Sequence, residues 1–442
     1  MAMIRPETEM KDSGVQWLGN IPKEWSVGKV KHEFYATKTI VGDKVNDYER
    51  LALTLNGVIK RSKDAGDGLQ PEKFDGYQIL KEHELVFKLI DLANVSTSRV
   101  GLSPYTGIVS PAYIVLHHRK DMNPRYGEYY FLSMWMNEVF NHIGGDGVRS
   151  ALNAKDLLNI PYLKVSPDEQ QAIADYLDET CSQIDEIIAE ARASIDEYKE
   201  LKQSVITEAV LHGFEEDSVK HSSIEWIGDY NSAFGMTRIG RFCFVTKLAG
   251  FEYTNAMADS IVTEFGVPIV RAQNVKMFRF HSDKIGEFIP EDISFQLNRS
   301  SLDKKCLLIT FIGAGIGDVC VFDEKERYHL APNVAKIVIF DEYKCLLDEH
   351  YLMYYLGSEA GQGEIRRISK ASAQPSLSME TIRSINVVLP PLGVQKQIVE
   401  YLNKKMLHMD SLIAEKEALI NDLEAYKKSL IYEVVTGKRR VV

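Results

Sequence analysis

The chain contains one segment twice. Residues 166–214 and 391–438 align at a constant offset of 225 residues over most of their length. The matched residues include Gln170, Ile173, Tyr176, Leu177, Asp185, Ala189 and Glu190 in the first copy and Gln395, Ile398, Tyr401, Leu402, Asp410, Ala414 and Glu415 in the second. A weaker match at an offset of 209, from Lys11 and Trp17 to Lys220 and Trp226, opens each half. Copies of roughly 220 residues are far longer than solenoid repeats, so we expect two related halves about a pseudo-twofold axis.

Each copy of the repeat predicts one long helix with a narrow apolar stripe. The stripe runs through Leu177, Cys181, Ile184, Ile188, Ala191, Ile195, Tyr198, Lys202 and Val205, and again through Leu402, Met406, Met409, Ile413, Lys416, Ile420, Leu423, Lys427 and Leu430. This alternation of four and three residues, sustained over about four heptads, is typical of a coiled-coil seam. Pro167 and Gly213, like Pro391 and Gly437, suit the first turn and the stop of a helix.

The two seams can bury each other. A twofold axis would make this pairing antiparallel, with the two globules at opposite ends of a rod. The alternative is that each helix packs along its own globule, but a helix of about 40 residues is about 60 Å long and exceeds a small domain. Lys202 and Lys427 occupy matching seam positions, where a charge is costly unless its stem reaches water or the seam has ended. The sequence leaves both explanations open.

A region of short strands and helices precedes each long helix. Strands are predicted at Ala112–His117, Val267–Arg271, Leu307–Ile312 and Val334–Phe340, and helices at Tyr126–His142 and Glu349–Gly357. We therefore expect an α+β protein, in which two α/β globules are separated by two long helices that form an antiparallel coiled coil. The predicted globules are 1–154 and 218–384, and the predicted helical regions are 155–217 and 385–442.

The net charge of −11 has to be located before it can exclude a nucleic-acid partner. Lys and Arg number 19 against 19 Asp and Glu in 1–154, and 19 against 21 in 218–384. The acidic excess lies in 155–217, with 5 against 16, whereas 385–442 has 9 against 7. Exposed charges are screened within about 8–10 Å at physiological salt, so nearly neutral globules can still carry basic patches that bind DNA.

Cysteine usage and hydropathy argue against several classes of protein. The five cysteines are scattered and none lies in a Cys-x-x-Cys pair, so we expect neither a disulfide framework nor a metal site. No run of about 18 apolar residues predicts a membrane span, and residues 1–14 are too polar for a secretory signal. We expect a cytoplasmic protein that does not bind a membrane.

Three motifs carry a resemblance to a known family. The opening Ser13–Trp25, the start of the first long helix at Pro167–Asp178, and Leu389–Leu392 leading to Gln395 each resemble the specificity subunits of type I restriction-modification systems. The likeness follows the whole chain in order. It departs locally, because Val394 stands where a Glu is usual, and Tyr230-Asn231-Ser232 replaces the Ile-Pro of the first opening.

The resemblance implies a DNA-binding subunit with no catalysis and no cofactor of its own. Each globule would be a target recognition domain that reads one half of a split sequence in double-stranded DNA. The paired helices would fix the gap between the halves and dock two methyltransferase subunits, which motor and nuclease subunits would join. Two readers on a rigid spacer can contact half-sites roughly 34–36 Å apart only if the spacer has a fixed length.

Two clusters in the second globule are candidate DNA contacts. The first combines Arg, Gln and Asn, which read base edges, with further cations: Arg271, Gln273, Asn274, Lys276 and Arg279. The second suits a loop that lies against phosphates: Arg366, Arg367, Lys370, Ser372 and Gln374. The alternative for each cluster is a solvated turn on the surface of the globule.

The first globule offers three shorter candidates. Arg149 and Ser150 precede the first long helix at the place of the second cluster, and the other candidates are Lys60, Arg61 and Lys63, and Ser98 with Arg99. Short basic runs are often only solvated surface. A side chain that touches only phosphate should weaken binding to all sequences alike when it is removed.

Three motifs resemble sequence motifs of enzymes. Ile312–Asp318 resembles a glycine loop for a nucleotide or S-adenosylmethionine, but such a loop must open a helix, and Val319–Phe322 reads as a strand. Asn123–Tyr126 resembles the Asn-Pro-Pro-Tyr of amino-methyltransferases but lacks the second proline. His117 and His118 suggest a metal pair, yet adjacent residues on a strand face opposite ways.

Two rival functions therefore stay open beside the specificity subunit. One is a DNA adenine methyltransferase with its own recognition domain, which would bind S-adenosylmethionine. The other is a coiled-coil scaffold with no role in nucleic-acid binding, which would not retain DNA in a sequence-dependent way.

Overall fold

The computed structural model describes residues 3–55, 57–63, 73–90, 92, 99–143, 151–214, 219–369 and 376–441. The chain divides into two compact units. The first unit comprises Met1–Arg192 and Glu417–Val442, and the second comprises Ala193–Lys416. Each unit therefore contains one globule together with a part of each long helix.

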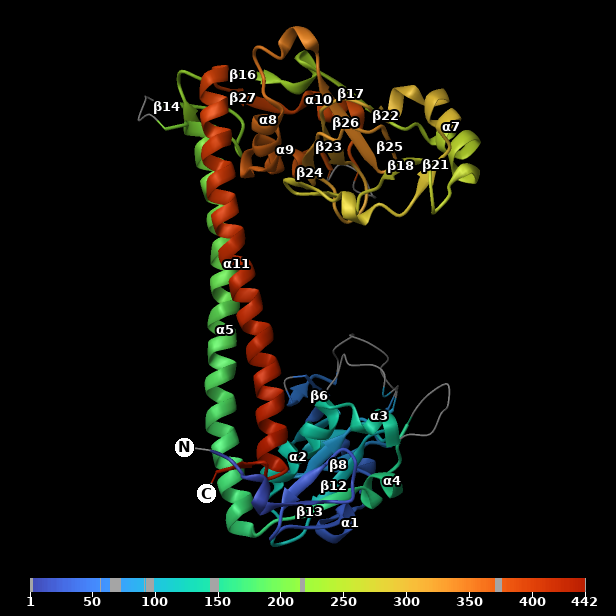
Figure 1. The fold of residues 1–442 in the computed structure, drawn as a ribbon, viewed down its shortest axis with the longest axis vertical. Helices are drawn as coiled ribbons and strands as arrows, with labels where there is room; N and C mark the ends of the chain where they lie inside the picture. Colours follow the sequence, from blue (N-terminus) through green and yellow to red (C-terminus); the bar gives the residue numbers. More distant parts are fainter. Residues whose placement is uncertain are drawn as a thin grey trace. The chain divides into compact units, whose positions relative to one another are not determined.

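Both predicted long helices are present (Figure 1). They are α5, Pro167–His212, and α11, Leu392–Val435. The first turn of α5 contains a proline, whose fixed φ suits this position, and the carboxylates of Asp168 and Glu169, which favour the positive end of the helix. Shortly after each helix stands a glycine with a φ of 71°, Gly213 and Gly437, in a conformation that other residues rarely adopt.

The predicted seam is buried. In the first unit the seam residues of α5 are at most 6% exposed: Leu177, Cys181, Ile184, Ile188 and Ala191. Asp185 pairs with Lys427 and Arg192 pairs with Glu424, so residue numbers rise along α5 as they fall along α11. The helices are therefore antiparallel in this unit. In the second unit the buried seam residues include Ile195, Leu402, Met406 and Met409.

The two seam lysines reach carboxylates on the opposite helix. Lys427 Nζ lies 2.6 Å from Asp185 Oδ2 in the first unit, and Lys202 pairs with Asp410 in the second. Their side chains are only 22% and 20% exposed, so the stems lie along the seam while the ammonium groups reach its edge. Each pair is the counterpart of the other at the offset of 225, which explains how a charge is accommodated at this position.

The globule of the first unit is built on two four-stranded sheets. The first sheet has the order β10-β9-β12-β5 and the second has the order β7-β6-β11-β8, in which β6 and β11 are parallel. The strands of the unit are β1 (Met3–Ile4), β2 (Met10–Asp12), β3 (Asn20–Pro22), β4 (Ser26–Lys29), β5 (Phe34–Ala36), β6 (Arg50–Thr54), β7 (Gly57–Arg61), β8 (Gln78–Leu80), β9 (Leu85–Phe87), β10 (Val100–Leu102), β11 (Gly107–Val109), β12 (Ile114–His118), β13 (Pro161–Lys164) and β28 (Arg439–Arg440). Its shorter helices are α1 (Val30–Glu33), α2 (Pro124–Met136), α3 (Val139–Ile143) and α4 (Ala154–Asn159).

The globule of the second unit repeats this plan. Its sheets have the orders β17-β26-β23-β24 and β21-β18-β25-β22, in which β18 and β25 are parallel. The strands are β14 (Val219–His221), β15 (Asp229–Asn231), β16 (Gly235–Arg238), β17 (Cys243–Lys247), β18 (Val267–Val270), β19 (Val275–Lys276), β20 (Arg279–Phe280), β21 (Phe288–Ile289), β22 (Ser301–Leu302), β23 (Cys306–Thr310), β24 (Val319–Phe322), β25 (Tyr328–Leu330), β26 (Val334–Ile339) and β27 (Asn386–Leu389). The helices are α6 (Gly250–Glu252), α7 (Glu291–Gln296), α8 (Glu349–Gly357), α9 (Glu359–Ser369) and α10 (Met379–Ser384).

The two globules therefore share a frame although their middles hardly match in sequence. In each, a central antiparallel pair is flanked by one further strand on either side, as β9 and β12 are in one and β23 and β26 in the other. A two-stranded pair joins the start of each globule to its end, β4 with β13 and β16 with β27. The predicted α+β class and the internal repeat are confirmed at the level of strand order.

One predicted helix is interrupted. The expected helix Tyr126–His142 consists of α2 and α3, because Asn137 caps α2 by donating from Nδ2 to the Ser133 carbonyl, 2.9 Å away. Glu138 follows with a φ of 57°, which an α-helix cannot continue through. In the described part of the chain, no helix combines the length and the apolar character that a membrane span requires.

Two adjacent isoleucines on α5 test the seam. Ile188 is 6% exposed and lies on the seam, whereas Ile187 is 44% exposed. We expect Ile188→Ala to lower the free energy of unfolding by about 2–5 kcal/mol, because it removes buried apolar contacts and leaves a cavity. Ile187→Ala is the matched control and should change it by less than about 0.5 kcal/mol. Urea denaturation followed by circular dichroism measures both, and equal losses would contradict a seam on one face only.

Candidate nucleic-acid interface

Two residues of the first predicted cluster in the second globule, Arg271 and Asn274, stabilise the turn in which they lie. Asn274 is 1% exposed; its Oδ1 accepts from the Arg271 backbone N–H at 2.8 Å, and its Nδ2 donates to the His281 carbonyl at 3.0 Å. The guanidinium of Arg271 pairs with Glu287. The groups that the sequence suggested for base reading are thus engaged within the protein at these two positions.

The remaining members of that cluster lie on the surface. Gln273, Lys276 and Arg279 are exposed, and Lys276 Nζ lies 3.8 Å from Asp318 Oδ2. Between β19 and β20 the chain turns at Phe278, which has a φ of 66° and whose ring packs against Tyr354 at a centroid distance of 5.3 Å. This packing fixes the hairpin that presents Lys276 and Arg279.

The glycine loop between β23 and β24 lies beside this hairpin. Gly313 and Gly317 have φ values of 100° and 91°, which require glycine, and the loop leads directly into strand β24. The predicted strand after the loop is confirmed, so the loop does not open a helix as a nucleotide-binding loop must. Gln362 of α9 donates to the Gly317 carbonyl at 3.1 Å and holds the loop against this helix.

The second predicted cluster begins on the same helix. Arg366 pairs with Glu359 at 2.7 Å, and Arg367 pairs with Glu364 at 3.1 Å while lying 5.4 Å from the Trp226 ring centroid. Lys370, Ser372 and Gln374 lie outside the described residues. Ser376, which follows them, is bridged to Ile312 at the start of the glycine loop.

The glycine loop links the hairpin of Lys276 to α9, because it contacts Lys276 through Asp318 and Gln362 through Gly317. We call the group Lys276, Gly313–Asp318, Gln362 and Arg366 the loop surface. Its exposed cations come from two segments about 90 residues apart in sequence. Between these segments Gly313 has open space beside its backbone, whereas Gly317 packs against Gln362 and Ile365. Sequence reasoning missed Gln362, since a single glutamine within an amphipathic helix carries no signal.

In the first globule the predicted cations lie on the hairpin of β6 and β7. Lys60 and Arg61 are exposed on β7, and Lys60 Nζ lies 5.1 Å from the Tyr105 ring centroid. Lys63 donates to the Val45 carbonyl at 2.7 Å. Arg50 stands opposite Arg61 in the strand register and adds a cation that the sequence pattern did not suggest.

Of the other predicted DNA contacts in the first globule, one is buried and three lie in the part of the chain that the structure does not describe. Arg99 is 1% exposed, and its guanidinium donates to the Leu92 carbonyl at 2.9 Å and to the Ile90 carbonyl at 3.3 Å. Ser98, Arg149 and Ser150 lie outside the described residues. Ala151, which follows them, is bridged to Ile90 just as Ser376 is bridged to Ile312, so both globules join the corresponding segments at the same place.

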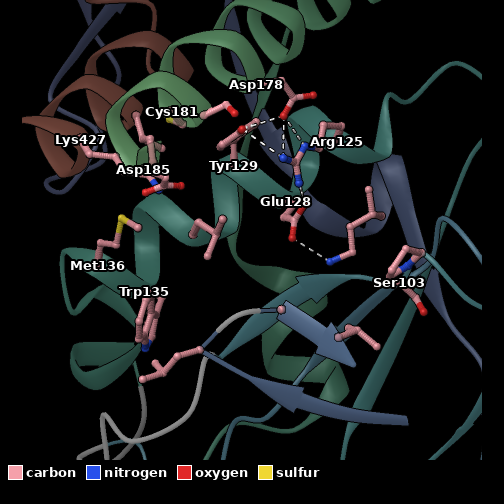
Figure 2. A pocket seen from close by; sticks show the side chains of 18 of the residues that line it. Ser103, Arg125, Glu128, Tyr129, Trp135, Met136, Asp178, Cys181, Asp185 and Lys427 are labelled. Carbon is pink, nitrogen blue, oxygen red and sulfur yellow. Dashed lines mark hydrogen bonds and ion pairs between the residues drawn. The ribbon is translucent and has the colours of Figure 1, made fainter. Parts of the chain in front are cut away.

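An acidic cleft of about 1100 Å³ lies between α2 and α5 of the first unit (Figure 2). Arg125 occupies one side of it, with Nε 2.6 Å from Asp178 Oδ1 and Nη1 bonded to Glu128. The carboxylates around the cleft are Glu82, Glu128, Asp178, Asp185 and Glu186, and its apolar lining includes Leu132, Trp135, Met136 and Ile431. Burial raises the pKa of Cys181 beside it to about 11, so this thiol stays protonated.

The motif that imitated a methyltransferase has a structural role. Asn123 is the N-cap of α2, and its Oδ1 accepts from the backbone N–H groups of Arg125 and Tyr126 at 2.8 and 3.1 Å. Pro124 occupies the first turn, where its missing N–H costs nothing. These contacts account for the Asn-Pro pair without a flipped base.

His117 and His118, the pair that suggested a metal site, form hydrogen bonds with separate partners. His117 Nδ1 lies 2.5 Å from Glu84 Oε1, and its Nε2 lies 2.8 Å from Thr37 Oγ1. The hydrogen bond to Glu84 raises the pKa of His117, and the same bond lowers the pKa of Glu84 against the opposing effect of burial. His118 instead contacts the carbonyl of Arg119.

Comparison with known proteins points in one direction. Residues 267–424 match the family model of the type I restriction modification DNA specificity domain. The type I restriction enzyme MjaVIII specificity subunit of Methanocaldococcus jannaschii is 24% identical over 320 residues, which cover 71% of this chain and 70% of the relative. The putative MjaX specificity subunit of the same organism is 21% identical over 442 residues, or 96% of each chain.

A solved structure has the same fold. A chain from a type I restriction-modification system, studied for its complex assembly and conformational transition, superposes with a TM-score of 0.72. The match covers 95% of this chain and 99% of that one at 12% sequence identity. At this identity the likeness concerns the fold alone.

The His117 contact predicts a pH dependence in the first globule. Because its pKa is raised in the folded state, His117 contributes stability that is full below the unfolded value of about 6.5 and is lost as pH rises through the folded pKa. We expect the free energy of unfolding to fall more between pH 6 and pH 9 in the wild type than in His117→Gln. His408→Gln, at an exposed histidine of α11, should behave as the wild type. Identical pH profiles in all three proteins would disprove the contribution.

Proposed function

We propose that the chain is a specificity subunit of the type I restriction-modification family and that it reads a split sequence in double-stranded DNA. The observation that carries the proposal is the repeat of one two-sheet globule on an antiparallel helix pair, although the middle parts of the two globules hardly match in sequence. Each globule would be a target recognition domain for one half of the target.

The loop surface supports a role in DNA contact. Lys276 and Arg366 border a glycine loop, an arrangement that suits a phosphate backbone because cations attract it and the absence of side chains admits it. Arg50, Lys60 and Arg61 would serve the first globule. We leave Arg99, Arg271 and Asn274 out of the proposed contacts because their polar groups are engaged within the protein and their side chains are largely buried. Lys276 and Arg366 also have carboxylate partners, but their side chains are about half exposed.

The helix pair would set the gap between the half-sites. An α-helix rises about 1.5 Å per residue, so one heptad is about 10 Å, or about three base pairs of duplex. Deleting one heptad from α5 and one from α11 should therefore move modification to sites with a shorter gap. Mapping of methylated adenines in a host with the wild-type or shortened chain measures this, and an unchanged gap would rule out the spacer role.

The acidic cleft would dock a partner subunit. Its carboxylates disfavour DNA, whereas its apolar lining with Trp135 and Met136 fits a protein segment that combines apolar and basic side chains. We assign this role to a methyltransferase subunit, with two such subunits on the helix pair and motor and nuclease subunits joining them. The chain itself would be non-catalytic and cytoplasmic.

Two observations separate this proposal from its rivals. Binding of S-adenosylmethionine by the isolated chain would favour a methyltransferase with its own recognition domain. Loss of sequence-dependent DNA retention in the complete complex would favour a coiled-coil scaffold. The glycine loop that leads into β24 rather than into a helix disfavours the first of these rivals.

The loop surface gives a prediction for DNA binding. We expect Lys276→Ala and Arg366→Ala each to weaken binding to target and unrelated duplexes by similar factors, and to reduce the dependence of log K on log salt by about one. Arg241→Ala, at an exposed arginine elsewhere in the same unit, is the control and should have little effect. Binding titrations of the assembled complex at several salt concentrations measure this. A loss confined to one base position would instead indicate base reading.

The acidic cleft gives a prediction for assembly. We expect Trp135→Ala and Glu186→Lys to weaken binding of the methyltransferase subunit at least about tenfold, since aromatic anchors and charge complementarity dominate such contacts. Glu197→Lys, on an exposed position further along α5, is the matched charge control. Titration of the purified subunits followed by calorimetry measures the affinity. Equal effects of both Glu→Lys changes would point to the general charge of the helix instead of the cleft.

A further inference from the structure

The same three polar contacts attach each globule to the helix pair of its own unit. The residues that make them recur at the offset of 225: Tyr126, Gln170 and Tyr129 in the first copy, and Tyr351, Gln395 and Tyr354 in the second. We call each set of three contacts a junction. Both junctions consist wholly of contacts within one unit.

The first contact joins the globule to the end of a long helix. Tyr126 Oη donates to the Val435 carbonyl of α11 at 3.3 Å, and Tyr351 Oη lies between the Val210 carbonyl of α5 and that of Val388, at 3.1 and 2.7 Å. The last carbonyls of a helix have no partner within it, so the phenols supply one. Burial raises the pKa of both phenols, which keeps them protonated as donors.

The second contact joins the globule to the start of the other long helix. Gln170 Oε1 accepts from the backbone N–H of Asn123 at 2.9 Å, while its Nε2 donates to the Val165 carbonyl at 2.8 Å. Gln395 repeats both bonds, to the N–H of Asp348 at 3.0 Å and to the Pro390 carbonyl at 2.8 Å. The two glutamines are 4% and 0% exposed. Each therefore ties the cap of the globule's helix to the first turn of the long helix.

The third contact lies about one turn further along α2 and α8, and about two turns further along α5 and α11. Tyr129 Oη donates to Asp178 Oδ1 at 2.7 Å, and Tyr354 Oη donates to Asn403 Oδ1 at 2.7 Å. Figure 2 shows the first of these at the edge of the acidic cleft. The carboxylate of one copy is an amide in the other, yet the same oxygen accepts at the same distance. What the repeat retains is the geometry of the contact, independent of its charge.

We propose that the junctions fix the angle of each globule on the helix pair and thereby make the gap in the DNA target strict. The inference rests on the proposed function. Three contacts that are not in line, shared between both helices, define an orientation, whereas a buried apolar surface alone allows small rotations. A globule of about 150 residues is about 35 Å across, so a tilt of about 6° moves its far surface by roughly one base-pair step of 3.4 Å. The tyrosines and glutamines are thus positioning residues for DNA reading.

Removing hydroxyl groups tests this without removing the rings. The variants are Tyr126→Phe with Tyr351→Phe, and separately Tyr129→Phe with Tyr354→Phe. All four rings are buried, but the acceptors of the second pair, Asp178 and Asn403, are accessible to water, which can replace the lost hydroxyl groups. The control is Tyr426→Phe, at an exposed position of α11 that lies outside both the seam and the junctions. Each full-length variant replaces the wild type in a host with its partner subunits. The readout is the distribution of gap lengths among methylated sites.

We expect the control to keep the wild-type gap. In the junction variants the share of methylated sites with a gap one base pair longer or shorter should rise about threefold to tenfold, the factor that one or two lost hydrogen bonds would produce. The two half-sequences should stay the same, and thermal unfolding should show a folded protein. A strict wild-type gap in both variants, or an equal loss of modification at all gaps, would overturn the inference. A wild type that directs no split motif would instead remove the proposed function itself.

Discussion

The apolar seam between α5 and α11 is the contact on which the rest of the structure depends. Each helix is too long to be buried by one globule, and a stripe of Leu, Ile and Met along it is stable only against a second stripe. The ion pairs Asp185–Lys427 and Lys202–Asp410 fix the register of α5 relative to α11. A one-heptad slip of one helix along the other would separate both ion pairs at once. The apolar seam therefore holds the two helices together, and the ion pairs select one alignment of them.

This arrangement lets one chain combine a constant frame with variable readers. The two sheets of each globule, the closing pairs β4–β13 and β16–β27, and the long helices recur in both copies. The segments that differ are loops at the ends of strands, such as the glycine loop of the second globule. Loops can change without disturbing the seam because few buried apolar side chains belong to them. Recognition can therefore diverge while the spacing of the frame is retained.

The sequence was most informative where a period or a repeat is long. A seam sustained over four heptads predicted both helices with their ends, and the alternation of apolar residues located the strand that follows the glycine loop. It was less informative where a single side chain decides the outcome. Arg99 and Lys60 look alike in sequence, but Arg99 is buried with its guanidinium bonded to the Ile90 and Leu92 carbonyls, whereas Lys60 is exposed. The tyrosines of the junctions were detectable, since the offset of 225 continues back to Tyr126.

The uneven charge of the long helices has a consequence for how such a reader would search a genome. Carboxylates outnumber cations by 16 to 5 in 155–217, so this surface repels polyanions, whereas the cations that we propose as DNA contacts lie on the nearly neutral globules. Contact with unrelated sequence is then confined to a few side chains, and the dwell time on wrong sites stays short. The acidic charge of the helices would thus increase the ratio of specific to non-specific DNA affinity, without an additional contact to the target site.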